Sequence, residues 1–333
     1  MPTLPSTLRR ALRVALAAVL ALVSARPAAA QLRGVHLTLD NDAYDFWVPM
    51  DVRPDEEYTN GMEVALDLAG APGPLRRLAP RLPACGGAET PAQECTATTA
   101  ALGHKIFTPR VDATPLPAGE RPYAGWLYAS ATTRLSKASR LRAAGVEVGV
   151  TGPPSGGEVV HETFHRIIGF WQPRGWSGQV PFEPGAVVRY DEAYMAADVR
   201  VGGVRVATLA PAWGAALGNV LTGAHAGLDL RLGHTVPHPW NEAADRGAGP
   251  VSAYVLARAR GDAVARNLFL DGSTFGGGPG VERIPFVGRW ELGAGVRYEG
   301  FTFEFRTLSR SREYRTEPRG HTYSTFALSY RLR

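Results

Sequence analysis

The sequence predicts an all-β fold, a transmembrane antiparallel β-barrel of about 12 strands with a short helix in an extracellular loop. Three observations predict it. The chain begins with an export-type segment, alternating stretches of about ten residues recur along most of its length, and no later segment approaches 18 uninterrupted apolar residues. Because a soluble β-sandwich shows similar alternation, the prediction also depends on aromatic residues near strand ends, such as Trp126 and Tyr298.

The first 30 residues have the pattern of a secretory signal peptide. Arg9, Arg10 and Arg13 precede the apolar run 14–23, and three alanines at 28–30 form a small-residue cleavage site. The apolar run is too short to cross a bilayer as a stable helix. We therefore expect a cleaved signal peptide at 1–30 and a single outer-membrane β-barrel domain at 31–333.

From residue 35 onward the polarity alternates with period two, and Gly, Pro, Asp or Asn interrupts it every ten to fifteen residues. The segments 146–150, 302–306 and 325–330 show the alternation most clearly. The predicted strands are 35–42, 58–68, 101–108, 123–135, 140–151, 187–200, 203–215, 219–233, 250–261, 281–298, 300–311 and 321–332.

The composition suits one large β-rich domain, with 38 Gly, 9% aromatic and 20% charged residues. The net charge of +5 is scattered, and no Lys/Arg cluster with interleaved aromatics appears, so we expect no nucleic-acid partner. Cys85 and Cys95 are the two cysteines, and in an oxidising exported setting they predict a small disulfide loop.

The segment 152–179 is the most unusual stretch of the chain. If 156–168 is helical, His161 and His165 lie one turn apart on one face. The letters HETFH match the H-E-x-x-H zinc motif, but a zinc peptidase needs a third ligand, for which only Glu183 or Glu192 is available. In the second interpretation His165 is the base that activates water and a neighbouring group orients it. A polar surface helix without chemistry is the third.

The strand order predicts that polar residues gather at one end of the barrel. If the first strand runs outward, Asn41 and Asp42 end it at the outer rim and the segment 58–61 begins the second strand there. Thr108 ends the third strand, and the histidine-bearing helix follows the fifth. Turn formation alone would also explain Asn and Asp at a strand end.

These motifs resemble those of the outer-membrane lipid A 3'-O-deacylases of the LpxR type, in order and over nearly the whole expected mature chain. The segments that carry the resemblance are Asn41-Asp42, YTNG at 58–61, GHKIFTP at 103–109, RPYAGWLY at 121–128, TGP at 151–153 with the helix after it, RGWSGQ at 174–179, AGLDLRLG at 226–233, RNLFLDG at 266–272 and SREY at 311–314. The resemblance implies a twelve-stranded barrel, an active site between the outer wall and a loop helix, and calcium-dependent ester hydrolysis.

The resemblance also implies roles for individual residues. His165 matches the histidine that activates water, and Asn41 and Asp42 match the polar pair at the metal and oxyanion site. Thr59 and Lys105 match further site positions.

Two further residues complete the expected site. His161 stands where the family has glutamine, so it would orient the water through an imidazole that titrates near neutral pH. Arg121 is expected to contact a phosphate of lipopolysaccharide.

The residue types fit this chemistry. Ester hydrolysis needs a base for water and positive charge near the developing oxyanion, and Ca²⁺ prefers oxygen ligands such as those of Asn41 and Asp42. We therefore expect a Ca²⁺-dependent lipid A deacylase, monomeric, in the outer membrane. The alternatives are a zinc metallopeptidase that uses the HETFH motif and a non-enzymatic outer-membrane barrel.

Overall fold

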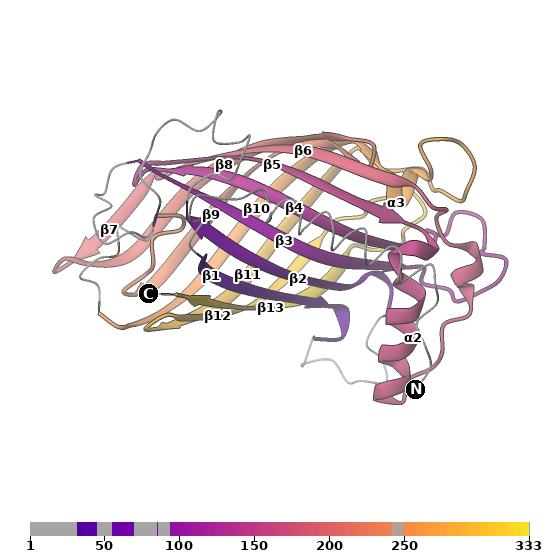
Figure 1. Ribbon diagram of the computed structural model, residues 1–333, viewed down its shortest axis with the longest axis horizontal. Coiled ribbons are helices and arrows are strands. Elements are labelled where there is room, and N and C mark those ends of the chain that lie inside the picture. The colour runs from indigo at the N-terminus through magenta and orange to yellow at the C-terminus, as the bar shows by residue number, and fades with distance from the viewer. Residues whose placement is uncertain are drawn as a thin grey trace.

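The structure, a computed structural model, describes residues 32–44, 55–69, 85, 94–241, 245 and 249–332. The predicted signal peptide at 1–30 lies outside the described residues. Antiparallel strands dominate the described part and wrap into a barrel, with helix α2 (Gly157–Ile168) at one end (Figure 1). Within the described residues, no helix combines the length and apolar character that a membrane crossing requires.

The strands follow one another around the barrel in chain order. They are β1 (Leu32–Asn41), β2 (Glu57–Ala69), β3 (Cys95–Thr108), β4 (Ala124–Ser136), β5 (Arg140–Thr151), β6 (Pro184–Tyr194), β7 (Ala197–Val201), β8 (Val204–Gly218), β9 (Leu221–His234), β10 (Val251–Asn267), β11 (Phe286–Tyr298), β12 (Phe301–Arg310) and β13 (His321–Arg331). The short helices are η1 (Asp42–Tyr44), η4 (Pro153–Ser155), η5 (Gly175–Gly178) and α3 (Leu268–Asp271).

Two pairings close the sheet. β1 pairs with β13, and β6 pairs with the second half of β8 through residues 187–193 and 212–218. β7 pairs with the first half of β8, so β6 and β7 are two parts of the predicted strand 187–200, interrupted at Met195 and Ala196. With these two counted as one, the barrel has the twelve strands that the sequence predicts.

Alternate residues of each strand face opposite environments. On β2, Met62 and Val64 are 48% and 49% exposed and belong to the apolar outer surface. The interior carries charges in pairs, and Arg258, for example, donates to Glu291 at 2.7 Å. The predicted disulfide between Cys85 and Cys95 is present.

The predicted gathering of polar segments at one end is confirmed. β1 ends at Asn41, β3 ends at Thr108 and β5 ends at Thr151, while β2 begins at Glu57 beside them. Helix α2 follows β5 and lies at this same end (Figure 1). This end of the barrel is therefore where the candidate site is built.

Candidate functional site

Helix α2 begins one residue after the start of the predicted helix 156–168 and ends where predicted, and glycines flank it at both ends. Gly156 and Gly169 take left-handed φ values of 76° and 72°, which a residue with a side chain adopts only with strain. The N–H groups of Gly169 and Phe170 donate to the carbonyl of His165 and close the helix. His161 and His165 lie on its buried face.

The start of α2 lies directly against the barrel wall at β4. A Cβ atom on Gly125 would lie 3.0 Å from the Cα of Gly157 and 2.2 Å from Oγ of Ser155, so a larger residue would push the helix away. Trp176 of η5 is buried beside Gly157, and its ring centroid lies 4.8 Å from that of Tyr123. These contacts fix the distance between the strands and the face of α2 that bears the two histidines.

Between α2 and the outer wall of β1, β2 and β3 lies a cavity of about 410 Å³. Its polar lining includes five of the predicted site residues: Asn41, Asp42, Thr59, His161 and His165. Asp55 and Asn60 line it as well. Its apolar lining is formed by Leu39, Met62, Ile106, Val160, Phe164, Ile168 and Phe170. The cavity thus places polar groups beside a surface suited to a hydrocarbon chain.

A β-bulge in β2 places two successive side chains in this cavity. The pairing of β2 with β3 shifts register between Tyr58 and Asn60, so Thr59 and Asn60 both reach the same side of the strand. The hydroxyl of Thr59 lies 2.6 Å from that of Thr108 and is held by it. In a regular strand one of the two side chains would face the lumen.

Asn41 and Asp42 line the cavity where β1 ends. Oδ1 of Asn41 accepts the N–H of Ala43 at 2.7 Å, and Oδ2 of Asp42 accepts the N–H of Glu56 at 2.9 Å. Asp42 is 1% exposed, and burial together with the charge of Asp55 raises its pKa well above the usual range. Its ionised form therefore needs a cation nearby.

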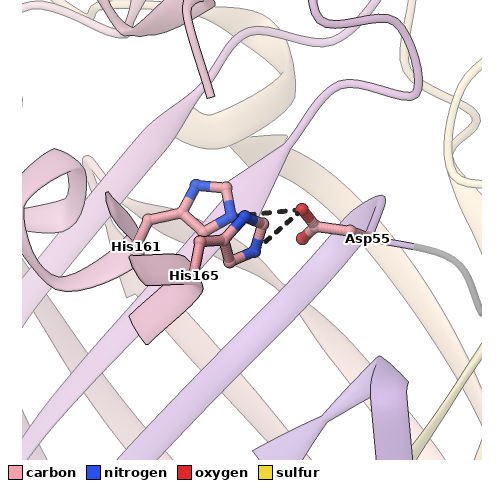
Figure 2. A group of neighbouring side chains, drawn as sticks. All are labelled: Asp55, His161 and His165. Carbon is pink, nitrogen blue, oxygen red and sulfur yellow. Dashed lines mark hydrogen bonds and ion pairs between the residues drawn. The ribbon is translucent and has the colours of Figure 1, made fainter. Parts of the chain in front are cut away.

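The carboxylate of Asp55 faces both histidines, whose rings lie next to each other (Figure 2). Its Oδ2 is 3.2 Å from Nε2 of His161 and 3.2 Å from Nε2 of His165. The outer nitrogens have separate partners: Nδ1 of His165 is 2.6 Å from the carbonyl oxygen of Trp171, and Nδ1 of His161 accepts the indole N–H of Trp176 at 3.2 Å.

These contacts move the pKa values of Asp55 and His165 in opposite directions. Burial alone would raise the pKa of Asp55, but hydrogen bonding to His161 and His165 outweighs it and lowers the pKa to about 2. Burial alone would lower the pKa of His165, but Asp55 and the Trp171 carbonyl outweigh it and raise the pKa. Asp55 is thus ionised, and it favours the imidazolium form of His165.

The sequence interpretation missed Asp55, and the two carboxylates that it offered as a third zinc ligand, Glu183 and Glu192, have other partners. Glu183 accepts hydrogen bonds from Asn219 and Ser273, and Glu192 pairs with Arg140. One signal was available, since Asp55 precedes the second strand at the rim where the polar segments gather.

Asp55, His161 and His165 offer three potential metal ligands within 4.8 Å of one another. The hydrogen bonds argue against the zinc interpretation of HETFH. Because an indole N–H can only donate, Nδ1 of His161 is unprotonated, and the neutral ring then carries its proton on Nε2. That nitrogen has no lone pair for zinc while the Trp176 bond exists.

Lys105 and Arg121 do not line the cavity, in contrast to their predicted contact with substrate. Lys105 is one residue from Ile106 on β3 and so faces the other side, where its Nζ lies 5.0 Å from the Tyr128 ring centroid. Arg121 is fully buried and donates to Glu57 at 2.9 Å. A structural role fits the position of Arg121, and neither residue is carried into the proposed site.

We expect Arg121→Met to lower barrel stability by about 3 kcal/mol, because it removes one partner of a buried ion pair. Urea unfolding, followed by the gel mobility of unboiled samples, measures this loss. Arg319→Met, at an ion pair whose arginine is 73% exposed, is the matched control and should change little. If Arg121 contacted substrate instead, its replacement would raise KM and leave the unfolding midpoint unchanged.

The closed barrel with an apolar outer surface, and a polar cavity under a helix at one rim, define an outer-membrane β-barrel protein with a site on its lipid-facing side. Residues 14–332 match the family model described as outer membrane protein LpxR. The chain belongs to the LpxR family, and the outer membrane is its location.

A solved structure of this family has the same fold. LpxR from Salmonella typhimurium is 17% identical, with a TM-score of 0.71 over 90% of this chain and 100% of that one. The β domain of the Bordetella autotransporter BrkA is 10% identical, with a TM-score of 0.46 over 90% and 98% of the two chains. The translocator domain of NalP from Neisseria meningitidis is 11% identical, with a TM-score of 0.43 over 98% and 97%. No curated protein sequence matches the chain.

Proposed function

We propose that this protein is a lipid A deacylase that hydrolyses an ester-linked acyl group, the 3'-acyloxyacyl group, of lipopolysaccharide in the outer leaflet. One observation carries the proposal: the imidazole of His165 shares one cavity, on the lipid-facing side of the barrel, with Asn41, Asp42 and Thr59. The family membership supports it. We further propose that the protein acts as a monomer after cleavage of a signal peptide at 1–30.

In this proposal His165 is the general base. The Trp171 carbonyl holds one ring proton on Nδ1, so the neutral ring, formed when the imidazolium gives up the proton that Nε2 donates to Asp55, can take a proton from water at Nε2. The resulting hydroxide attacks the ester carbonyl. The proton then passes from Nε2 to the departing alkoxide, so the base is restored without a covalent intermediate.

Asn41 and Asp42 are the residues that would hold Ca²⁺. The donor set fits a hard cation. Asp42 is buried and its pKa is raised. Asp55 adds a second carboxylate, and one of its oxygens is buried without a hydrogen-bond partner among the described residues. When bound, the ion supplies positive charge for the oxyanion. Thr59 lines the same cavity, where its hydroxyl can contact the substrate carbonyl.

The apolar half of the cavity supports a lipid substrate. Met62 and Phe164 line it and are 48% and 41% exposed, so the cavity continues onto surfaces that face hydrocarbon. An acyl chain can therefore enter sideways from the outer leaflet while the ester reaches His165. The 3' position follows from the family resemblance alone.

The test is an assay of the purified protein in detergent with lipid A, read by mass spectrometry. Loss of an acyloxyacyl group in Ca²⁺, and no loss in EGTA, is the expected result. Glu162→Gln should keep full activity, whereas a zinc peptidase using HETFH would lose its base. Unchanged lipid A in the presence of Ca²⁺ would overturn the proposed function.

We expect the activity to rise with pH through a value above 6.5, the usual pKa of imidazole. A raised pKa means that His165 stays protonated to higher pH, and protonated imidazole accepts no proton from water. The stabilisation from the His165–Asp55 ion pair has the opposite dependence, since it is complete below pH 6.5 and is lost as the pH rises through the raised pKa. The dependence of kcat/KM on pH at saturating Ca²⁺ measures the first effect. A midpoint below pH 6.5 for the rise of kcat/KM would contradict this expectation.

A further inference from the structure

We propose that Asp55 is a positioning residue for the base His165, and that His161 and Trp176 hold Asp55 in place. The inference rests on the proposed hydrolysis and gives Asp55, His161 and Trp176 roles in it. Its starting point is a continuous chain of contacts across the site, which runs from the indole of Trp176 to the imidazole of His161, the carboxylate of Asp55 and the imidazole of His165.

Each contact in the chain is within hydrogen-bond distance, and three of its four side chains are buried. The Trp176 N–H donates to Nδ1 of His161 at 3.2 Å, and Nε2 of His161 is 3.2 Å from Oδ2 of Asp55. The same Oδ2 is 3.2 Å from Nε2 of His165 (Figure 2). Trp176, His161 and His165 are 1%, 2% and 3% exposed.

The partners determine the direction of each hydrogen bond. An indole N–H only donates, so it leaves the proton of neutral His161 on Nε2, from which it is donated to Asp55. A carbonyl only accepts, so the oxygen of Trp171 holds the proton of neutral His165 on Nδ1. Ionised Asp55 also only accepts, so Nε2 of His165 carries a second proton while it contacts Oδ2 of Asp55. In their neutral forms the two rings are held in opposite tautomers, and only His165 then has its lone pair on Nε2. The hydrogen-bond partners of the two rings therefore identify His165 as the base.

Asp55 acts on the base in two ways. A carboxylate beside Nε2 stabilises the imidazolium that forms when water gives up its proton. In the imidazolium form, the hydrogen bond that Nε2 donates to Asp55 also fixes the ring plane, together with the Trp171 carbonyl at the other nitrogen. Oδ1 of Asp55, the oxygen available to the proposed Ca²⁺, has no hydrogen-bond partner among the described residues, so the two imidazoles are the side chains that hold this carboxylate.

Asp55→Asn tests the proposal because asparagine keeps the shape and the acceptor oxygen but removes the charge. We expect kcat for lipid A deacylation to fall between tenfold and a hundredfold while KM changes less than twofold. Glu162→Gln removes a carboxylate next to His161 without touching the chain, and it should leave both constants unchanged. An Asp55→Asn variant with full kcat would overturn the proposal.

A double-mutant cycle tests whether Trp176 acts through Asp55. Trp176→Phe deletes the N–H and keeps a large aromatic ring, and we expect kcat to fall several-fold. In the Asp55→Asn background the same change should have no further effect, since the chain is already broken. Trp213→Phe on β8 is the matched control. Multiplicative losses in the double variant would show that the two residues act independently and would overturn the proposed chain.

Imidazole nitrogen NMR of the protein in micelles gives a readout independent of turnover. We expect His161 protonated on Nε2 and neutral His165 protonated on Nδ1, with the His161 tautomer no longer fixed in Trp176→Phe. Identical tautomers at both residues would overturn the chain even if the protein deacylates lipid A. Opposite tautomers in a protein that leaves lipid A intact would instead overturn the proposed function, and with it the catalytic role of Asp55.

Discussion

His165→Gln is expected to lower kcat for lipid A deacylation by about a thousandfold, the largest effect of any single substitution at the site. The amide of glutamine can still donate a hydrogen bond, as the ring does to its acceptors, but it takes no proton from water at neutral pH. The measurement is the initial rate of acyl release from lipid A in detergent, with the fold confirmed by the gel mobility of the unboiled protein.

The matched control is His225→Gln on β9, where the histidine pairs with Asp191 and lies outside the cavity between α2 and the wall. This variant should retain wild-type kcat. A His165→Gln enzyme with more than a tenth of the wild-type rate would remove His165 from the role of base, since general base catalysis accounts for at least about a hundredfold.

Asp42→Asn is expected to give the second-largest loss, about a hundredfold at millimolar Ca²⁺. The variant removes the buried anion that would bind the cation and keeps the hydrogen bond from the Glu56 N–H. Activity titrated against Ca²⁺, and calorimetry of Ca²⁺ binding without lipid, measure the change.

The wild-type protein should lose all activity in EGTA and recover it when Ca²⁺ is added back. Asp191→Asn, at a carboxylate outside the cavity, is the control and should keep the calcium dependence of the wild type. If Asp42→Asn bound Ca²⁺ with unchanged affinity, the ion would lie elsewhere.

Much of the fold could be predicted from local patterns. Glycines at 156 and 169 bracket α2, and alternation with turn residues located the strands, because each of these signals acts within a few residues. The interruption at Met195 and Ala196 was not predictable, since the residues on both sides keep the same alternation and the break arises from pairing with two halves of β8.

The candidate site was predicted less completely. Chain order was enough to bring Asn41, Asp42 and Thr59 to the rim that carries α2, but it does not determine which face of a strand a side chain occupies. Lys105 shows the difference, because it lies at the correct height on β3 but one position away from the cavity face. Asp55 was missed since its importance comes from contacts with a helix more than 100 residues later.

The alternation of side chains across the barrel wall separates the residues that maintain the fold from those that meet lipid. Arg258 and Glu291 face inward, whereas Leu39, Met62 and Ile106 face the cavity. Substitutions on the outward-facing surface alone can therefore change which acyl chain the protein prefers. Laboratory evolution for a longer or shorter chain should accordingly accept many substitutions at outward positions near the rim without loss of folding yield.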